Sequence, residues 1–476
     1  MSKTSSNNTA TMGRPKFDPL RDLISGAIMA ATSVPQLIAY AETVGYAGWR
    51  GLATAGPPLL MWGLVTGSPF MNAGVTAITA LMSKSDLDGE SYLREHGEEA
   101  YVELVAAYSM YCGIASVVLA VLGFAKLAGL VPKPVRTGFK WGCAVSVLTS
   151  ALPNGLYDTG ASQIKSLVAS NGTWNTMIAW IKINVPQATG AISVMGIFYS
   201  LLHPWEWAVV PAVVFVVGTW FIMNGQNLLP KFLPPGTEVI LVTALTTWSS
   251  MNFDYSGGVV GEIPTLDAEA GILIPGTNGW RFPVEIMDYR KVLNAPLAES
   301  MGGWHILAVT STLFAAVNFL SIMGIAAGFE SENGISWSPD RELVAQGLSC
   351  GVAALVGSAP VSGSLSRSLV SRMTGTTSQL ACILTAFIWI LAMPYMSIMS
   401  STPKAALSAV IVSAVVKGVC LPKDLMKLQG INFLVGWGTG IVTALLSPTL
   451  GFGIGLIFYL LSMPFQPKQT KSTKQD

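Results

Sequence analysis

The chain has 476 residues, of which 27 are Lys or Arg and 26 are Asp or Glu, so 11% are charged, against about 25% in a typical globular domain. With 51% hydrophobic residues and a net charge of +1, the composition excludes a soluble globule, which needs a charged surface, and a disordered chain, which needs low hydrophobicity. It also excludes a strongly basic nucleic-acid-binding protein. We therefore expect an integral membrane protein with many spans.

Long stretches without charge mark the candidate spans. A membrane helix needs about 20 apolar residues, and the longest stretch, 428–467, is long enough for two helices divided at Ser447-Pro448. Together the stretches predict twelve to fourteen membrane segments, and they lack the alternation of a β-barrel. They cover residues 23–41, 51–83, 104–125, 141–157, 183–205, 207–230, 239–253, 301–329, 343–366, 373–403, 405–416 and 428–467.

Charge in the connecting segments predicts the orientation, because cytoplasmic loops are rich in Lys and Arg. The basic segments 126–140 and 417–427 are expected to be cytoplasmic. The segments 84–103 and 254–300 carry seven acids each and are expected to be external loops. Both ends of the chain are basic, so we expect a cytoplasmic N-terminal tail, a cytoplasmic C-terminal tail and an even number of crossings.

Asn171 begins an Asn-Gly-Thr glycosylation sequon in a stretch that we expect to be external, which makes it a glycosylation candidate. The spans contain no HExxH motif, no GxSxG motif and no paired carboxylates. We therefore expect no enzyme activity, no cofactor and no metal site.

Two hydrophobic segments are interrupted by small residues at matching places in the two halves of the chain. They are NAGVTAITA (72–80) and SGSLSRSLV (362–370). A helix that begins inside the membrane leaves up to four N–H groups unpaired, and this is tolerated only beside a wet cavity or a ligand. Two such helix starts facing each other would bind an anion. The alternative is that the small residues only allow close helix packing.

At these residues the sequence resembles the SulP family, the sulfate permeases also called solute carrier family 26. The resemblance runs from about Phe17 to Leu461. The segments that carry it are DLISGAIMAATSVPQLIAYA (22–41), MNAGVTAITALM (71–82), VPKPVRTGFKWG (131–142), GGVVGEIPTL (257–266), SPDRELVAQGLSCGVAALVGSAPVSGSLSRSLVSRMTGTTSQLA (338–381) and TPKAALSAVIVSAV (402–415).

The resemblance implies an all-α membrane protein of about fourteen transmembrane segments in two inverted seven-segment repeats, with core and gate domains and half-helices at segments three and ten. It places a transport domain at residues 21–463, between tails at 1–20 and 464–476. Family members usually carry a cytoplasmic STAS domain after the transport domain, and none is expected in the short basic tail. The resemblance also implies elevator-like alternating access and leaves a homodimer open.

Carried over by position, the anion-binding residues come from three segments. We expect backbone N–H groups near Thr76 and Ser366 to donate to the anion, together with the side chains of Gln36 and Ser366, while Arg367 supplies a positive charge. Gln36 could instead make an interhelical hydrogen bond, and Arg367 a salt bridge or a contact with lipid headgroups. The expected substrate-binding residues are Gln36, Val75, Thr76, Ala77, Ser364, Leu365, Ser366 and Arg367.

One position departs from the family pattern. Ser321 aligns with a carboxylate that is often taken to couple transport to H⁺ or Na⁺, and a Ser cannot carry a proton at physiological pH. Exchange, uniport or coupling through another acid then becomes the expectation. Glu42, at the end of the first apolar stretch, is the candidate substitute, unless it sits at the external interface.

The sequence thus predicts a secondary transporter of small inorganic anions, an antiporter or another carrier, with both termini cytoplasmic and the plasma membrane favoured. Its partners would be the anion and membrane lipid, and sulfate is the first expectation, before bicarbonate, chloride or oxalate. A bicarbonate/chloride exchanger and an anion channel on the same scaffold remain as alternatives.

Overall fold

A computed structural model describes residues 16–124, 131–185, 188–230, 233, 236–263, 272–273, 281–333 and 336–465. Most of the two tails expected at 1–20 and 464–476 therefore lies outside the described residues, as do residues 264–266 of the segment 257–266. The chain divides into two compact units. Unit 1 is 1–126, 221–255 and 259–403, and unit 2 is 127–220, 256–258 and 404–476.

Unit 1 contains the same series of elements twice: two helices, a two-residue strand, a short helix and a further helix. The first series is α1 (Pro19–Val44), α2 (Gly48–Val65), β1 (Ala73–Gly74), α3 (Ala77–Asp86) and α4 (Gly89–Val121). The second is α14 (Trp304–Asn333), α15 (Pro339–Leu355), β4 (Ser362–Gly363), α16 (Leu365–Met373) and α17 (Leu380–Ala392), which η3 (Met393–Ser401) extends.

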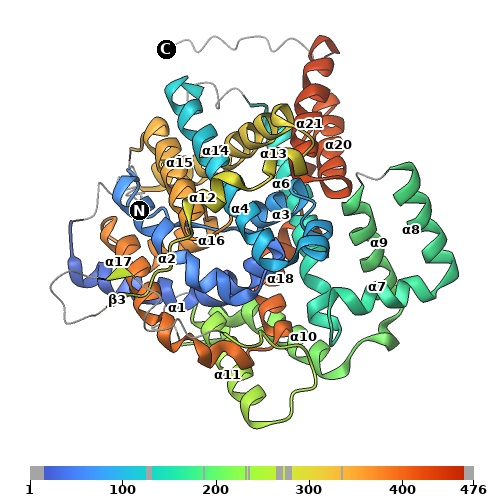
Figure 1. The fold of residues 1–476 in the computed structure, drawn as a ribbon, viewed down its shortest axis with the longest axis horizontal. Helices are drawn as coiled ribbons and strands as arrows, with labels where there is room; N and C mark the ends of the chain where they lie inside the picture. The colour runs from blue at the N-terminus through green and yellow to red at the C-terminus, as the bar shows by residue number, and fades with distance from the viewer. Residues whose placement is uncertain are drawn as a thin grey trace, which may run out of the picture. The chain divides into compact units, whose positions relative to one another are not determined.

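Helices of the two series pack on one another. α15 packs on α4 and α2, and α17 packs on α2 and α1, so blue and orange ribbons interleave in Figure 1. The remaining elements of this unit are α11 (Thr237–Asn252), β2 (Ile272–Leu273), β3 (Arg281–Phe282), α12 (Tyr289–Asn294) and α13 (Leu297–Ser300).

Local sequence signals account for the boundaries of α1 and α2. Asp18 caps α1 by accepting from the N–H groups of Leu20 and Arg21 at 3.1 and 3.2 Å, and Gly45 ends the helix at φ 117°. The two helices approach closely, since a Cβ on Gly51 would lie 2.1 Å from the carbonyl oxygen of Leu37. Close backbone approach at small residues is the usual way membrane helices gain packing energy.

Unit 2 is organised around α6 (Lys133–Leu156), which packs on α18 (Lys404–Cys420) and α20 (Ile431–Leu445). A Cβ on Gly138 would lie 2.0 Å from the carbonyl oxygen of Gly436, so α6 and α20 touch through their backbones. The unit also holds α7 (Ala161–Ser170), α8 (Gly172–Asn184), α9 (Thr189–Leu202), η2 (Pro204–Glu206), α19 (Lys423–Met426), α21 (Pro448–Ser462) and η4 (Met463–Phe465), and the boundary with unit 1 falls inside α10 (Val209–Leu228).

Five described helices are long and apolar enough to cross a membrane, and four shorter apolar ones accompany them. The stretch 428–467 divides as predicted, because Ser447 caps a new helix, α21, at Pro448. The stretch 183–205 does not form one spanning helix: α8 ends at Asn184, and the 14-residue α9 follows. Pro186 interrupts that stretch in the sequence, and proline disfavours a continuous helix.

Candidate functional site

The two half-helices of unit 1 begin side by side because their preceding strands pair. β1 and β4 are antiparallel, with Ala73 opposite Gly363 and Gly74 opposite Ser362. Asn72 extends the pairing: its carbonyl oxygen accepts from the N–H of Ser364 at 2.8 Å, and its N–H donates to Ser368 Oγ at 3.0 Å. The structure therefore brings together the two interrupted segments, which lie about 290 residues apart in the sequence.

Two buried carboxylates hold the turns that flank these half-helices. Asp22 of α1 accepts from the N–H of Thr377 at 2.6 Å and from Ser378 Oγ at 2.5 Å, which fixes the turn after α16. Glu342 of α15 accepts from Thr66 Oγ1 at 2.7 Å and from the N–H of Gly67 at 2.8 Å, which fixes the approach to β1. Both carboxylates are fully buried and accept hydrogen bonds, so their role is to position backbone.

The start of α16 is open. Its N-cap residue, Ser364, makes no capping hydrogen bond, and the first intrahelical bond runs from the N–H of Ser368 to the oxygen of Ser364. The N–H groups of residues 365–367 therefore have no helical acceptor. Leu365 and Ser366 are exposed while Arg367 is buried, so the start of α16 is accessible and has a cation beside it.

The start of α3 is partly closed by a reciprocal pair of threonines. The N–H of Thr76 donates to Thr79 Oγ1 at 2.8 Å, and the N–H of Thr79 donates to Thr76 Oγ1 at 3.2 Å. Thr79 also donates its hydroxyl proton to the carbonyl oxygen of Thr76 at 3.1 Å. The amide of Thr76, which the sequence suggested as a donor to an anion, is thus already engaged, and the open amides of α3 are those of Ala77 and Ile78.

Arg367 links the two helix starts. Its side chain is 2% exposed, and Nη2 donates to the carbonyl oxygen of Val75, just before α3, at 2.9 Å. Its Nε and Nη1 are buried without a hydrogen-bond partner. Tyr40 of α1 and Cys382 of α17 lie close enough to interact with it electrostatically. None of the described carboxylates lies within salt-bridge distance of it, so its charge is uncompensated.

Other polar atoms, on α1 and in the segment before β1, also lack a hydrogen-bond partner. The carboxamide oxygens of Gln36 on α1 and of Asn72 before β1 are buried and unbonded, as is the hydroxyl of Ser33, one turn before Gln36. Turning a carboxamide by 180° would present its N–H donors instead. Asn72, Tyr40, Ser33 and Thr79 were not singled out from the sequence. For Thr79 the signal was available, because a Thr three residues after another Thr is a capping pattern.

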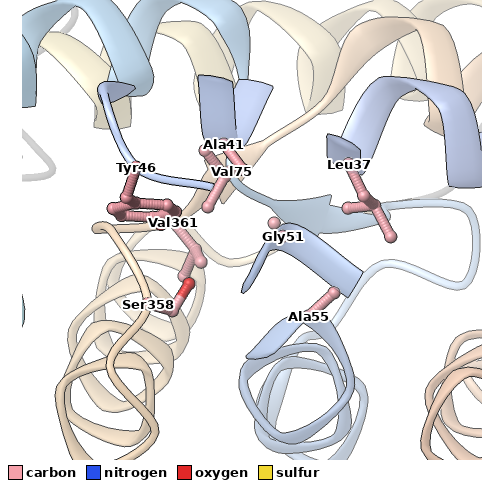
Figure 2. Close-up of a pocket in the computed structure, with 9 residues that line it drawn as sticks. Leu37, Ala41, Tyr46, Gly51, Ala55, Val75, Ser358 and Val361 are labelled. Carbon is pink, nitrogen blue, oxygen red and sulfur yellow. The ribbon is translucent and has the colours of Figure 1, made fainter. Parts of the chain in front are cut away.

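A small pocket, with room for about one water molecule, lies beside β1 (Figure 2). Gly74 and Val75 form part of its wall, with Leu37 of α1, Gly51 of α2 and Ser358. The hydroxyl of Tyr46, which also lines it, accepts from the N–H of Ala359 at 3.2 Å. No charged residue lines this pocket, so the open helix starts beside Arg367 are the better candidate for an anion site.

Comparison with known proteins agrees with this architecture. The model of the sulfate permease family matches residues 20–437. The chain belongs to the sulfate permease family.

Among its relatives, human solute carrier family 26 member 6 is 26% identical over 458 residues, covering 93% of this chain and 54% of that protein. A probable sulfate transporter of Mycobacterium tuberculosis is 25% identical over 403 residues, covering 83% of this chain and 61% of that one. The chain thus spans little more than half the length of these relatives.

Two solved structures share the fold. Murine solute carrier 26 family member A9, described as an anion transporter, aligns with a TM-score of 0.69 at 18% identity, covering 97% of this chain and 73% of that one. The transmembrane domain of the cyanobacterial bicarbonate transporter BicA aligns with a TM-score of 0.67 at 15% identity, covering 94% of this chain and 99% of that one. The expected all-α, solute-carrier-26-type membrane fold is confirmed.

The two coupling candidates lie in different surroundings. Ser321 is half-buried on α14, next to the turn where the oxygen of Asn318 accepts from Ser362 Oγ at 3.4 Å, so it lies near β4. Glu42 lies in the last turn of α1, where its carboxylate would be 3.5 Å from a Cβ on Gly48. A coupling role for Glu42 stays a prediction.

Proposed function

We propose that this sulfate permease family member is a secondary transporter of small inorganic anions, with sulfate as the first substrate to test. The observation that carries the proposal is the uncompensated guanidinium of Arg367, held between two helix starts with unpaired amides. A buried cation without a carboxylate is costly, and an anion bound beside it removes that cost. Relatives named as sulfate and bicarbonate transporters support the substrate class.

The transport cycle that we propose is elevator-like alternating access, in which unit 1 carries the anion and unit 2 supports its movement. Its support is that all site residues belong to unit 1. The β1–β4 pairing and the contacts of Asp22 and Glu342 hold both half-helices within that unit, so they would move together. A site with one guanidinium and neutral hydrogen-bond donors could bind sulfate, bicarbonate, chloride or oxalate.

The deciding experiment is reconstitution into liposomes, followed by uptake of labelled sulfate, bicarbonate and chloride with and without imposed pH and Na⁺ gradients. We expect at least one of these anions to enter faster than into empty liposomes, and Ser366→Ala to slow that entry while the amount of reconstituted protein is unchanged. Uptake of all three at the empty-liposome rate would refute the proposal.

An anion channel on the same scaffold is the second candidate, and Ser321 favours it because no proton-carrying group stands at that position. Electrical recording separates the two. A channel passes a large anion current without counter-substrate, whereas a coupled carrier does not.

Introducing an acid at position 321 is expected to create a pH dependence. In Ser321→Glu, the ionised carboxylate would offset the charge of Arg367, so uptake should fall as pH rises through the carboxyl pKa. Protonation at lower pH should restore uptake. Ser321→Gln has the same size without the ionisation and should lack this decline. If Ser321→Glu and Ser321→Gln give the same pH profile of uptake, a charge at position 321 does not affect anion binding.

Removing the hydroxyl of Thr79 is expected to raise the KM for the anion. The hydroxyl of Thr79 accepts from the N–H of Thr76 and donates to the carbonyl oxygen of Thr76. The hydroxyl of Thr76 therefore makes only a long hydrogen bond to Thr79 Oγ1, at 3.3 Å, which it can exchange for one to an anion. Thr79 is the third residue of α3 and completes the capping box whose N-cap is Thr76, and such an interaction contributes about 1 kcal/mol to the order of the helix start. If the anion must restore that order when it binds, Thr79→Val raises KM about fivefold.

The matched control is Thr54→Val on α2, because Thr54 is also buried and its hydroxyl only donates to the carbonyl of Arg50, at 2.7 Å. Thr79→Ser should restore the lower KM. A KM that rises equally in the Thr54 and Thr79 variants would point to a general packing defect instead.

A further inference from the structure

Positive charge is concentrated in two short segments of unit 2, at the start of α6 and in the connection from α18 to α20. Residues 131–142 and 417–428 together hold six Lys or Arg and one acid, Asp424, so their net charge is six minus one, or +5. The whole chain has a net charge of +1, so the rest of it is net negative. We call the six bases the basic surface: Lys133, Arg136, Lys140, Lys417, Lys423 and Lys427.

The three bases of α6 share one side of that helix. Lys133, Arg136 and Lys140 follow one another at spacings of three and four residues, which places them within about 60° of one another around the helix axis. Lys133 and Lys140 are exposed, and Arg136 is half-buried. The other residues of this stretch are half-buried Thr137, which shares that side, and the buried Pro134, Val135, Gly138 and Phe139.

The second basic segment folds against this part of α6. The indole N–H of Trp141 donates to the carbonyl oxygen of Val419 at 3.2 Å, and α19 packs on α6. Arg136 and Asp424 both lie close enough to Lys140 to interact with it electrostatically. The two basic segments, about 280 residues apart in the sequence, are therefore side by side within unit 2.

The described part of the chain leaves the basic surface without neutralising partners. Its salt bridges and side-chain hydrogen bonds involve none of the six bases. Cytoplasmic loops are rich in Lys and Arg wherever these lie in the loop, so orientation in the membrane does not by itself account for bringing two basic loops together. Like charges that are held together repel one another, so an anionic partner would stabilise this arrangement.

Apolar side chains beside the bases indicate which anionic partner fits. Leu421 and Met426 are 58% and 64% exposed, and Met426 lies between Lys423 and Lys427 in the sequence. From this surface α6 and α18 continue into the charge-free stretches 141–157 and 405–416. Bases next to exposed apolar groups at the end of a membrane span match a phospholipid, whose charged headgroup lies directly above its acyl chains.

We propose that the basic surface binds the headgroups of anionic phospholipids in the leaflet that it faces, with Leu421 and Met426 directed toward the acyl chains. The loop charges predict this leaflet to be the cytoplasmic one. The proposal concerns unit 2 alone and does not depend on which anion is transported.

Selective quenching by anionic lipid tests the proposal on the full-length protein. Cys420 is exposed and lies inside the second basic segment, while the other four cysteines are buried, so a fluorophore can be attached there. The labelled protein is inserted into phosphatidylcholine nanodiscs that contain a small, equal fraction of brominated phosphatidylglycerol or brominated phosphatidylcholine. The quenching ratio of the two samples reports whether anionic lipid is enriched at the surface.

We expect brominated phosphatidylglycerol to quench at least about threefold more than brominated phosphatidylcholine at low salt, because one base near an anionic membrane surface contributes about a fivefold preference. The ratio should fall toward one at high salt. It should also fall toward one when Lys140→Gln, Lys423→Gln and Lys427→Gln are combined. The matched control combines Lys140→Arg, Lys423→Arg and Lys427→Arg, which keeps the charge and should keep the ratio.

Three outcomes would overturn the proposal. Equal quenching by the two lipids in the unsubstituted protein would mean that the surface borders lipid without attracting anionic headgroups. Weak quenching by both would mean that water or another protein, such as an acidic partner, covers Cys420. A raised ratio that survives the three glutamines would assign the enrichment to other charges. The substituted side chains are exposed, so both variants should fold, which a single symmetric size-exclusion peak would verify.

Discussion

Arg367→Met is expected to lower the initial rate of anion uptake by at least about tenfold. The side chain is desolvated, it bonds Val75, and it retains N–H groups at Nε and Nη1 without an acceptor. A hydrogen bond to a charged group contributes about 1.5–3 kcal/mol, which corresponds to about a tenfold to hundredfold loss in anion affinity. Labelled-anion uptake over a range of concentrations would measure it.

Two further measurements separate an anion-binding role from a structural one. Arg367→Lys keeps the charge but not the geometry of the guanidinium, so it should retain more uptake than Arg367→Met. If Arg367 served only to hold Val75 in place, Arg367→Met would lower the melting temperature and the yield of protein while the KM of the surviving transporters stayed normal. Unchanged uptake in both variants would remove Arg367 from the site.

The half-helices could be predicted because the sequence around each helix start carries a local signal. Small residues from Asn72 and from Ser362 break a hydrophobic run that would otherwise continue, and a helix start needs no distant partner to be recognised. The division of the last hydrophobic stretch at Ser447-Pro448 has the same origin, since a serine cap followed by proline is a local signal. In both cases the chemistry within a few residues decides the structure.

The way the two starts are joined could not be predicted in the same way. The pairing of Ala73 with Gly363 spans about 290 residues, and two-residue strands have no periodicity to detect. The buried neighbours of Arg367 depend on how α1 and α17 pack. Even the donor assignment changed, because Thr79 occupies the Thr76 amide. The positions of the two helix starts were thus accessible from the sequence, while the partners of their polar atoms were not.

Gly74→Ala is expected to reduce uptake nearly as much as Arg367→Met, although it removes no polar group. A Cβ on Gly74 would lie 2.8 Å from Nη1 and 3.0 Å from Nη2 of Arg367, closer than side chains tolerate. Gly74 also has φ +156°, where an L-residue is strained. The added methyl group should therefore push the guanidinium away from Val75 and from the open helix starts, and uptake kinetics would show the loss.

Gly363→Ala in the partner strand is the matched control. Its Cβ would meet Ile322 Cγ1 at 3.0 Å and Met71 Sδ at 3.2 Å. The unbranched Met71 side chain can move, and neither contact involves Arg367. Gly363→Ala should therefore lower stability slightly and keep most of the uptake. If Gly74→Ala and Gly363→Ala lose uptake equally, the β1–β4 pairing itself is the sensitive element. A larger loss for Gly74→Ala, at a melting temperature equal to that of Gly363→Ala, would mean that the position of the guanidinium limits transport, because only that substitution reaches Arg367.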